Sequence, residues 1–213
     1  MLRSGVLTGR TIALAGADPA LVAVLESLGA RTATVNVGSP SHLSEPQTAL
    51  GRDGPPRSLV ADARPAFEAA GGGYDGVRAA LDGAFAAARE TAVACWIPTG
   101  EAGSTADASA DGGTRTATGA GEIERGGQIV FIAPAPGAGR HAGAARSGLE
   151  NLARTLSTEW ARHGITTVAI LPGDTTGEAA LADLVAWLCS PAGAYLSGTA
   201  LTLDRVLQPV ESS

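Results

Sequence analysis

Residues 127–173 constrain the fold most strongly, because they contain two short apolar segments separated by one long amphipathic segment. Residues 128–133 and 165–171 are rich in Ile and Val, which predicts two buried β-strands. Residues 141–162 between them have the apolar periodicity of a helix. A strand, a helix and a second strand in this order form a β-α-β unit, so the two strands are expected to be parallel and covered on both faces. The apolar stripe of the helix consists of Leu149, Leu152, Leu156 and Trp160.

The rest of the chain continues this alternation of strands and helices. A buried strand followed by a helix is expected from residues 11–15 onward, and a second strand at residues 31–37. A long amphipathic helix is expected at residues 74–98, and another helix after Gly173. The length of 213 residues fits one domain with a sizeable core. The pattern therefore predicts a single α/β domain over residues 1–213.

Two segments interrupt the pattern. Residues 38–57 are rich in Gly, Pro and Ser, and residues 99–126 consist mainly of Gly, Ala, Ser, Thr and Asp. Segments with so few apolar side chains cannot bury enough surface to form a core, which predicts loops or mobile insertions. For residues 99–126, a lid or a partner-binding arm is the alternative to a tolerated surface loop.

Charge and composition bear on which partners, locations and sites can be expected. The formal net charge of −6 gives no reason to expect nucleic acid or an anionic membrane as a partner. The sequence shows neither a long uncharged apolar stretch nor a cleavable signal pattern, so a soluble cytoplasmic protein is expected. Cys95 and Cys189 lie in apolar segments and are expected to be reduced thiols. The three histidines lack the spacing of metal ligands, so no metal site is expected.

Three features carry a resemblance to a known family. Pro172-Gly173 ends the second strand of the β-α-β unit, its helix contains the phrase ARSGLENL, and SPAGAYLSGTALTLD lies near the C-terminus. In these features the chain resembles the short-chain dehydrogenase/reductase family. The resemblance implies a Rossmann-like, doubly wound parallel sheet with helices on both faces and a last strand at residues 199–203. It implies six strands instead of the family's seven, because residues 38–57 show no pattern for a further strand and helix.

The resemblance also locates the positions of the family's catalytic Asn-Ser-Tyr-Lys tetrad. Ala142 stands at the Tyr position and has no proton to donate, while Arg146 at the Lys position differs from Lys in its hydrogen-bonding shape. His141 is an alternative acid, but five residues along a helix place it about 140° from Arg146. A capping or solvent-facing role is the other interpretation of His141. The resemblance therefore implies no catalytic residue in this chain. The residues at the four tetrad positions are Ala80, Pro134, Ala142 and Arg146.

The family's glycine-rich cofactor loop is also reduced. Only Gly16 of that loop remains, and Asp18-Pro19 has the pattern of a helix N-cap followed by the first helical residue. An N-cap carboxylate would use the free amide groups and place negative charge where a diphosphate would bind. We therefore expect no cofactor in this chain and NAD(P) in a partner subunit. A nucleotide bound in another pose is the alternative.

The segments that keep the resemblance are those through which family members form dimers and tetramers. The leading interpretation is a non-catalytic subunit that pairs with a homologous active dehydrogenase in a dimer or tetramer and supports its stability or substrate pocket. The alternatives are a divergent NAD(P)-dependent oxidoreductase acting on a carbonyl or hydroxyacyl substrate, and a small-ligand-binding regulatory module. The residues expected at the interface are Val77, Leu81, Phe85, Leu149, Leu152, Leu156, Trp160 and Tyr195.

Overall fold

A computed structural model describes residues 3–35, 54–97 and 126–203. Its centre is a six-stranded sheet in the order β2-β1-β3-β4-β5-β6, in which every neighbouring pair is parallel. The predicted α/β class, the parallel sheet and the expected six strands are confirmed for the described part of the chain. The strands are β1 (Thr11–Ala15), β2 (Arg31–Thr34), β3 (Ser58–Asp62), β4 (Gln128–Ile132), β5 (Thr166–Pro172) and β6 (Thr199–Leu203).

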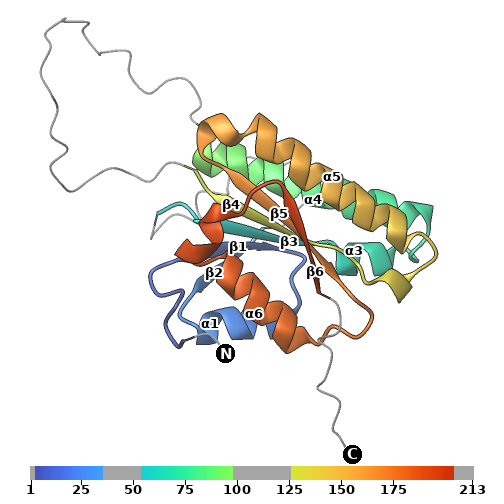
Figure 1. Cartoon of the computed structure of the whole chain (residues 1–213), viewed down its shortest axis with the longest axis horizontal. Coiled ribbons are helices and arrows are strands. Elements are labelled where there is room, and N and C mark those ends of the chain that lie inside the picture. The colour runs from blue at the N-terminus through green and yellow to red at the C-terminus, as the bar shows by residue number, and fades with distance from the viewer. Residues whose placement is uncertain (1–2, 36–53, 98–125, 204–213) are drawn as a thin grey trace, which may run out of the picture.

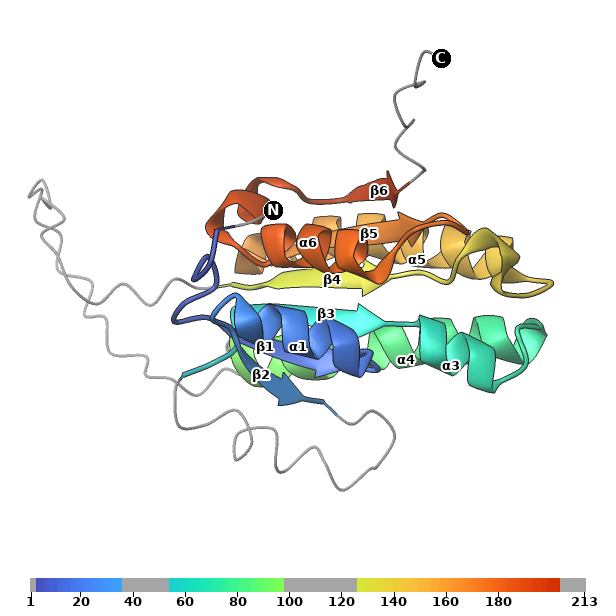
Figure 2. The same ribbon diagram turned by 90° about the horizontal axis from the view of Figure 1, so that it is seen from below.

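Helices cover both faces of the sheet, so the molecule has three layers (Figures 1 and 2). Helices α1 (Pro19–Ser27) and α6 (Glu178–Leu188) lie on one face, and α4 (Tyr74–Thr91) and α5 (Ala142–Glu159) lie on the other. The short helix α3 (Arg64–Ala69) follows β3 and packs against α4. Further short helical turns are η2 (Ala92–Trp96), η3 (Pro136–Ala138), η4 (Ala161–His163) and η5 (Pro191–Tyr195).

The sheet separates two hydrophobic cores, and side chains alternate between them along each central strand. In β4, Ile129 and Phe131 belong to the core beneath α4 and α5, whereas Val130 and Ile132 belong to the core beneath α1 and α6. All four side chains are fully buried. This two-sided burial explains why the strand sequence is continuously apolar instead of alternating with polar residues.

Small residues allow the helices to approach one another closely. On α5, Gly148 faces Leu81 of α4, and a Cβ atom at position 148 would lie only 2.8 Å from the Leu81 Cδ2 atom. Leu81 therefore occupies the space that a larger residue at position 148 would need. The contact joins α4 to α5 as one layer over the sheet.

Some element boundaries differ from the predictions. The helix expected at residues 74–98 ends as α-helix at Thr91 and continues as the π-helical turn η2, in which the Trp96 indole N–H donates to the Pro56 carbonyl oxygen at 2.7 Å. The strand expected at residues 31–37 is observed as Arg31–Thr34. Helix α3 was not predicted, because six residues carry too little periodicity to identify a helix.

Residues 38–53 and 99–125, which make up most of the two predicted insertions, lie outside the described residues. The expectation that they are loops or mobile insertions therefore stays a prediction. Among the helices that the structure describes, none has the length and apolar character needed to cross a membrane.

Candidate functional site

The carboxyl ends of β1 and β3 form the position at which an open α/β sheet usually binds its ligand. The chain leaves β1 toward β2 on one side, while β3 pairs with β1 on the other side. Ligands bind outside the strand ends where the order reverses in this way. We call residues 15–18 and 61–64, which cover the ends of these two strands and the residues after them, the switch point.

The backbone at the switch point is tightly packed. Gly16 directly follows β1 with a positive φ of 70°, and a Cβ atom there would lie 2.5 Å from the Asp62 carbonyl oxygen. Both the left-handed conformation and the close approach require glycine at this position. Gly16 is therefore explained by its own packing against β3.

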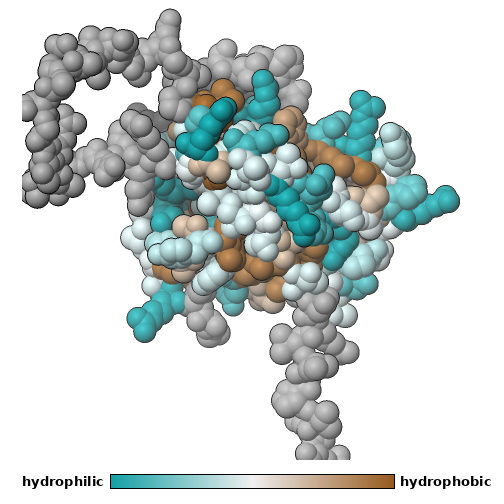
Figure 3. All heavy atoms as spheres, turned by 45° about the horizontal axis from the view of Figure 1, so that its top comes forward, coloured by the Kyte–Doolittle hydropathy of each residue, from teal (hydrophilic) through white to brown (hydrophobic). Residues whose placement is uncertain are grey.

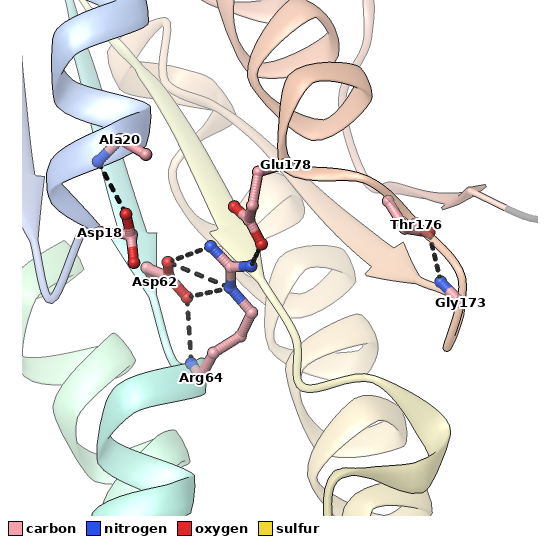
Figure 4. Close-up of polar contacts among 7 residues, drawn as sticks. All are labelled: Asp18, Ala20, Asp62, Arg64, Gly173, Thr176 and Glu178. Carbon is pink, nitrogen blue, oxygen red and sulfur yellow. Dashed lines mark hydrogen bonds and ion pairs between the residues drawn. The ribbon is translucent and has the colours of Figure 1, made fainter.

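The predicted helix start at Asp18 is confirmed. The Asp18 side chain accepts a hydrogen bond from the Ala20 amide at 2.7 Å, and Pro19 is the first residue of α1. Figure 4 shows this cap beside the end of β3. One carboxylate therefore already occupies part of the helix N-terminus, where the unpaired amides of a dinucleotide-binding loop would receive a phosphate.

An ion network crosses from the end of β3 to the start of α6 (Figure 4). The Arg64 guanidinium donates to both carboxylate oxygens of Asp62, with Nη2 to Oδ2 at 2.8 Å, and to Glu178 Oε1 at 2.6 Å. The Arg64 amide also donates to Asp62 Oδ1 at 3.0 Å. Side-chain exposure rises from 0% at Asp62 through 17% at Arg64 to 52% at Glu178. The network is therefore anchored in the core at Asp62 and reaches solvent at Glu178.

Burial and pairing act in opposite directions on the pKa values of this network. Burial raises the pKa of Asp62 above its ordinary value, although the hydrogen bonds and charge of Arg64 oppose that effect. For Arg64, burial works against the cation, but hydrogen bonds to Asp62 and Glu178 outweigh it and raise its pKa. Arg64 is accordingly a permanent cation held between two carboxyl groups.

Sequence reasoning missed this network. No pairing of Asp62 or Arg64 was predicted. Their spacing of two residues after an apolar strand was a visible local signal. Glu178 is 114 residues from Arg64, and only the fold brings them together.

The four residues at the expected tetrad positions come from α4, from α5 and from the segment after β4. Ala80 on α4 and Ala142 on α5 are buried in the core at 1% and 0% exposure. Pro134 follows β4 and is also buried. None of these three side chains carries an acid, a base or a hydroxyl group.

Arg146 is the polar member of that set, and it binds backbone carbonyl groups. Its Nη1 atom donates to the Pro134 oxygen at 2.8 Å and to the Pro172 oxygen at 2.6 Å. Pro134 follows β4 and Pro172 ends β5, so the guanidinium joins the ends of two adjacent strands. The structure thus brings Arg146 and Pro134 into direct contact, in a geometry that braces the sheet edge.

His141 lies at the N-cap position of α5, but its side chain makes no capping hydrogen bond. The His141 backbone amide donates to the Gly72 carbonyl oxygen at 3.2 Å. Its Nδ1 atom is buried and has no hydrogen-bond partner in the described structure. The capping role considered for this side chain is therefore not observed, and its catalytic role stays a prediction.

The expected interface residues fall into three groups by exposure. Leu149 and Leu156 are 0% and 2% exposed in this chain's own core, so their side chains have almost no surface to offer a partner. Phe85 and Tyr195 are 43% and 92% exposed. The face in Figure 3, which brings α4 and α5 forward, carries brown hydrophobic areas among teal and pale ones. The partly buried residues that pack against the core are Val77, Leu81, Leu152 and Trp160.

The cysteines are free thiols with raised pKa values. Burial raises the pKa of Cys95 above its ordinary value, and complete burial raises the pKa of Cys189 to about 12. In residues 3–35, 54–97 and 126–203, no group of three or more His, Cys, Asp or Glu side chains is arranged to hold a metal ion.

Comparisons with known proteins identify the fold. No family model and no curated protein sequence matches the chain. Among solved structures, the citronellol catabolism dehydrogenase AtuB of Pseudomonas aeruginosa PAO1 matches with 22% identity and a TM-score of 0.61, over 96% of this chain and 97% of that one. The enoyl-[acyl-carrier-protein] reductase (NADH) of Aquifex aeolicus VF5 matches with 16% identity and a TM-score of 0.60, over 94% and 97% of the two chains. A Serratia marcescens short-chain dehydrogenase/reductase mutant matches with 18% identity and a TM-score of 0.60, over 93% and 97%. The chain therefore has the Rossmann-like fold of short-chain dehydrogenase/reductase structures.

Proposed function

We propose that this chain is a non-catalytic subunit that pairs with an active dehydrogenase of the same fold and supports its stability or substrate pocket. The observation that carries the proposal is the environment of Ala142 and Arg146. Carbonyl reduction needs a proton donor beside the substrate, commonly assisted by a nearby cation. Ala142 is fully buried and has no such proton, and Arg146 is committed to two backbone carbonyl groups.

The charges at the switch point support the absence of NAD(P) from this chain. Asp18 caps α1, while Asp62 and Glu178 both pair with Arg64. Two carboxylates therefore pair with one guanidinium, and a third caps α1, in the region where a dinucleotide diphosphate would have to bind. A diphosphate would meet net negative charge there, so we expect the cofactor in the partner subunit only.

Exposed apolar side chains support a role in assembly. Phe85 and Val93 are 43% and 44% exposed on α4 and the turn that follows it, and Tyr195 is 92% exposed before β6. Large aromatic side chains on a surface are typical of interface anchors. We propose that the outer face of α4 and the turn before β6 contact the active subunit, in a dimer or a tetramer.

The test is nucleotide titration of the purified chain, alone and after co-expression with an intact dehydrogenase of this fold encoded beside it. We expect no heat of binding with NAD, NADH, NADP or NADPH for the chain alone. We expect a stable mixed complex that binds cofactor only at the sites of the active subunit. The active subunit alone provides the positive control. Micromolar nucleotide binding by the isolated chain would contradict the proposal.

A divergent NAD(P)-dependent oxidoreductase is the second candidate. Two of the matching solved structures carry a nicotinamide cofactor in their names, NADH for the Aquifex aeolicus enzyme and NADP⁺ for a Bacillus cereus enoyl-acyl carrier protein reductase complex. His141 also has a buried ring nitrogen without a partner, next to Ala142. Turnover of carbonyl substrates with NADH or NADPH by the isolated chain, abolished by His141→Asn, would favour this candidate over the non-catalytic subunit.

A further inference from the structure

Residues 173–178 connect β5 to α6 across the carboxyl edge of the sheet. We propose that this segment is a strap, that the Arg64–Glu178 ion pair is its latch, and that it opens at Glu178 while the Asp62–Arg64 pair stays closed. The proposal concerns the free chain, and it does not depend on whether the chain has a catalytic partner.

The strap is held at three points by three different parts of the fold. At its start, Asp174 Oδ1 accepts a hydrogen bond from the Gly137 amide in η3 at 2.6 Å. In the middle, the Thr176 hydroxyl donates to the Leu203 carbonyl oxygen at the end of β6, at 2.8 Å. At its end, Glu178 accepts from Arg64 at 2.6 Å. The strap therefore ties the start of α3, the turn η3 and the end of β6 to the start of α6.

Thr176 gives the strap a fixed shape. Its hydroxyl oxygen also accepts a hydrogen bond from the Gly173 amide at 2.8 Å, and Gly173 in turn donates to Leu203 at 2.9 Å (Figure 4 shows the Thr176 to Gly173 contact). These short-range bonds form a compact turn at the β5 side. The β5 end of the strap is thus pinned by hydrogen bonds to β6. At the α6 end, the Gly177 carbonyl oxygen accepts from the Ala180 and Leu181 amides of the first helical turn, and the Arg64–Glu178 pair ties this end to α3.

Of the two carboxylates that bind Arg64, Asp62 is buried and Glu178 is exposed to solvent. Arg64 contacts Asp62 through two guanidinium nitrogens, and the Asp62 side chain is completely buried. Moving Arg64 would leave a buried carboxylate without its partner, which is strongly unfavourable. Glu178 is 52% exposed and can exchange Arg64 for water at little cost. Opening therefore separates Glu178 from Arg64 and leaves the buried pair intact.

The latch lies beside the switch point. Gly16, after β1, packs against the backbone of Asp62, which is the residue that anchors Arg64. Figure 4 shows the Arg64 side chain reaching from the start of α3 toward Glu178 on α6. A closed latch therefore places a side-chain bridge next to the strand ends at which this class of sheet binds ligands.

The test is hydrogen–deuterium exchange of the full chain, followed by mass spectrometry of peptides that cover residues 173–180. Glu178→Gln removes the negative charge that pairs with Arg64 and keeps the size of the side chain. We expect exchange of these amides to accelerate several-fold in this variant, while peptides from β3 and β4 stay unchanged. Equal exchange in the wild type and in Glu178→Gln would overturn the proposal.

A second variant separates the latch from the effect of an acidic residue at a helix N-terminus, which also stabilises a first turn. Glu178→Gln combined with Ala179→Glu restores one negative charge to the first turn of α6 but not the position that meets Arg64. Both positions are exposed, so neither change threatens folding. We expect this double variant to exchange as fast as Glu178→Gln. Recovery of the slow wild-type exchange would show that the helix dipole, and not Arg64, holds the strap.

Discussion

Arg146, which the resemblance places at the family's Lys position, holds two neighbouring strand ends together. Its guanidinium donates to the carbonyl oxygens of Pro134 and Pro172, which belong to neighbouring strand ends. Arg146→Met should leave both carbonyl groups without this donor and lower the free energy of unfolding by about 1–3 kcal/mol. Urea unfolding followed by circular dichroism measures the change. Arg78→Met is the control, because Arg78 is 74% exposed, and its ion pair with Asp82 should be worth less than about 1 kcal/mol.

The buried Asp62 side chain should make the stability of the protein depend on pH. Burial raises its pKa in the folded state above the ordinary value of 3.8, so the folded state binds the proton more tightly than the unfolded state. Protonated Asp62 therefore stabilises the folded state. This stabilisation is complete below pH 3.8 and is lost as pH rises through the folded-state pKa of Asp62. Asp62→Asn lacks this titration. The stability of the variant minus that of the wild type should increase as pH rises above about 3.8. Urea unfolding of both proteins across this range tests the sign, and a decreasing difference would contradict it.

Cys95 and Cys189 should differ in their reaction with alkylating agents. Only the thiolate reacts, and complete burial both shields Cys189 and raises its pKa to about 12. Cys95 is half-buried, with a pKa raised by burial. With iodoacetamide at neutral pH, native protein should be modified slowly at Cys95 and not at Cys189, and denatured protein at both. Peptide mass spectrometry gives the two rates separately, and fast modification of native Cys189 would show that the α6 end of the core opens.

At the scale of elements, the start of α1 rests on one side chain. Asp18 accepts from the Ala20 amide and has no second capping side chain to replace it among the described contacts. Asp18→Ala should lower the free energy of unfolding by about 1 kcal/mol. Asp82→Ala on the exposed face of α4 is the matched loss of a carboxylate and should change stability by less than about 0.5 kcal/mol. Equal effects of the two substitutions in urea unfolding would argue against the cap.

Elements with long apolar patterns could be predicted from the sequence, and short or irregular ones could not. The β4-α5-β5 unit was predicted because its strands are continuously apolar and its helix repeats Leu at helical spacing. Helix α3 has six residues and η2 departs from α-helical geometry, so neither has a distinct period. The Asp18 cap was predictable because it is local. The contact of Arg64 with Glu178 and the contacts of Arg146 were not, since these side chains reach residues that only the fold brings near.

The same reasoning explains the interface predictions. An apolar stripe such as Leu149 and Leu156 shows that a helix face is covered, but not whether the chain itself or a partner covers it. The structure buries both in the core. Phe85 differs from them, because it leaves 43% of its surface exposed on the outer side of α4. The exposed fraction of a side chain tells whether the chain's own core covers it or a partner could, and a sequence pattern does not supply that fraction.

At the scale of the whole molecule, polar contacts and exposed aromatic side chains lie in different places. The carboxyl edge of the sheet is held by this chain's own polar side chains, through the Asp62–Arg64–Glu178 network, Arg146 and the strap. The outer faces still carry exposed aromatic residues, Phe85 and Tyr195. An edge occupied by internal contacts, together with these exposed aromatic side chains, is the basis of the proposed role in association.

Phe85→Glu is the substitution that tests association directly. Because Phe85 is partly exposed and lies on a helix, Glu should be tolerated in the folded chain, and Glu is also a good helix former. A carboxylate in the centre of an apolar interface would be desolvated without a partner, so the mixed complex with the active dehydrogenase should weaken by tenfold or more, about 1.4 kcal/mol or more. Size-exclusion chromatography with light scattering of the co-expressed proteins measures the complex, and thermal unfolding of the isolated variant checks its fold.

Ala23→Glu, on the exposed side of α1 beneath the opposite face of the sheet, is the control and should leave the complex intact. If Phe85→Glu also leaves the complex intact, the outer face of α4 is not the contact, and the exposed Tyr195 before β6 becomes the position at which the same substitution decides.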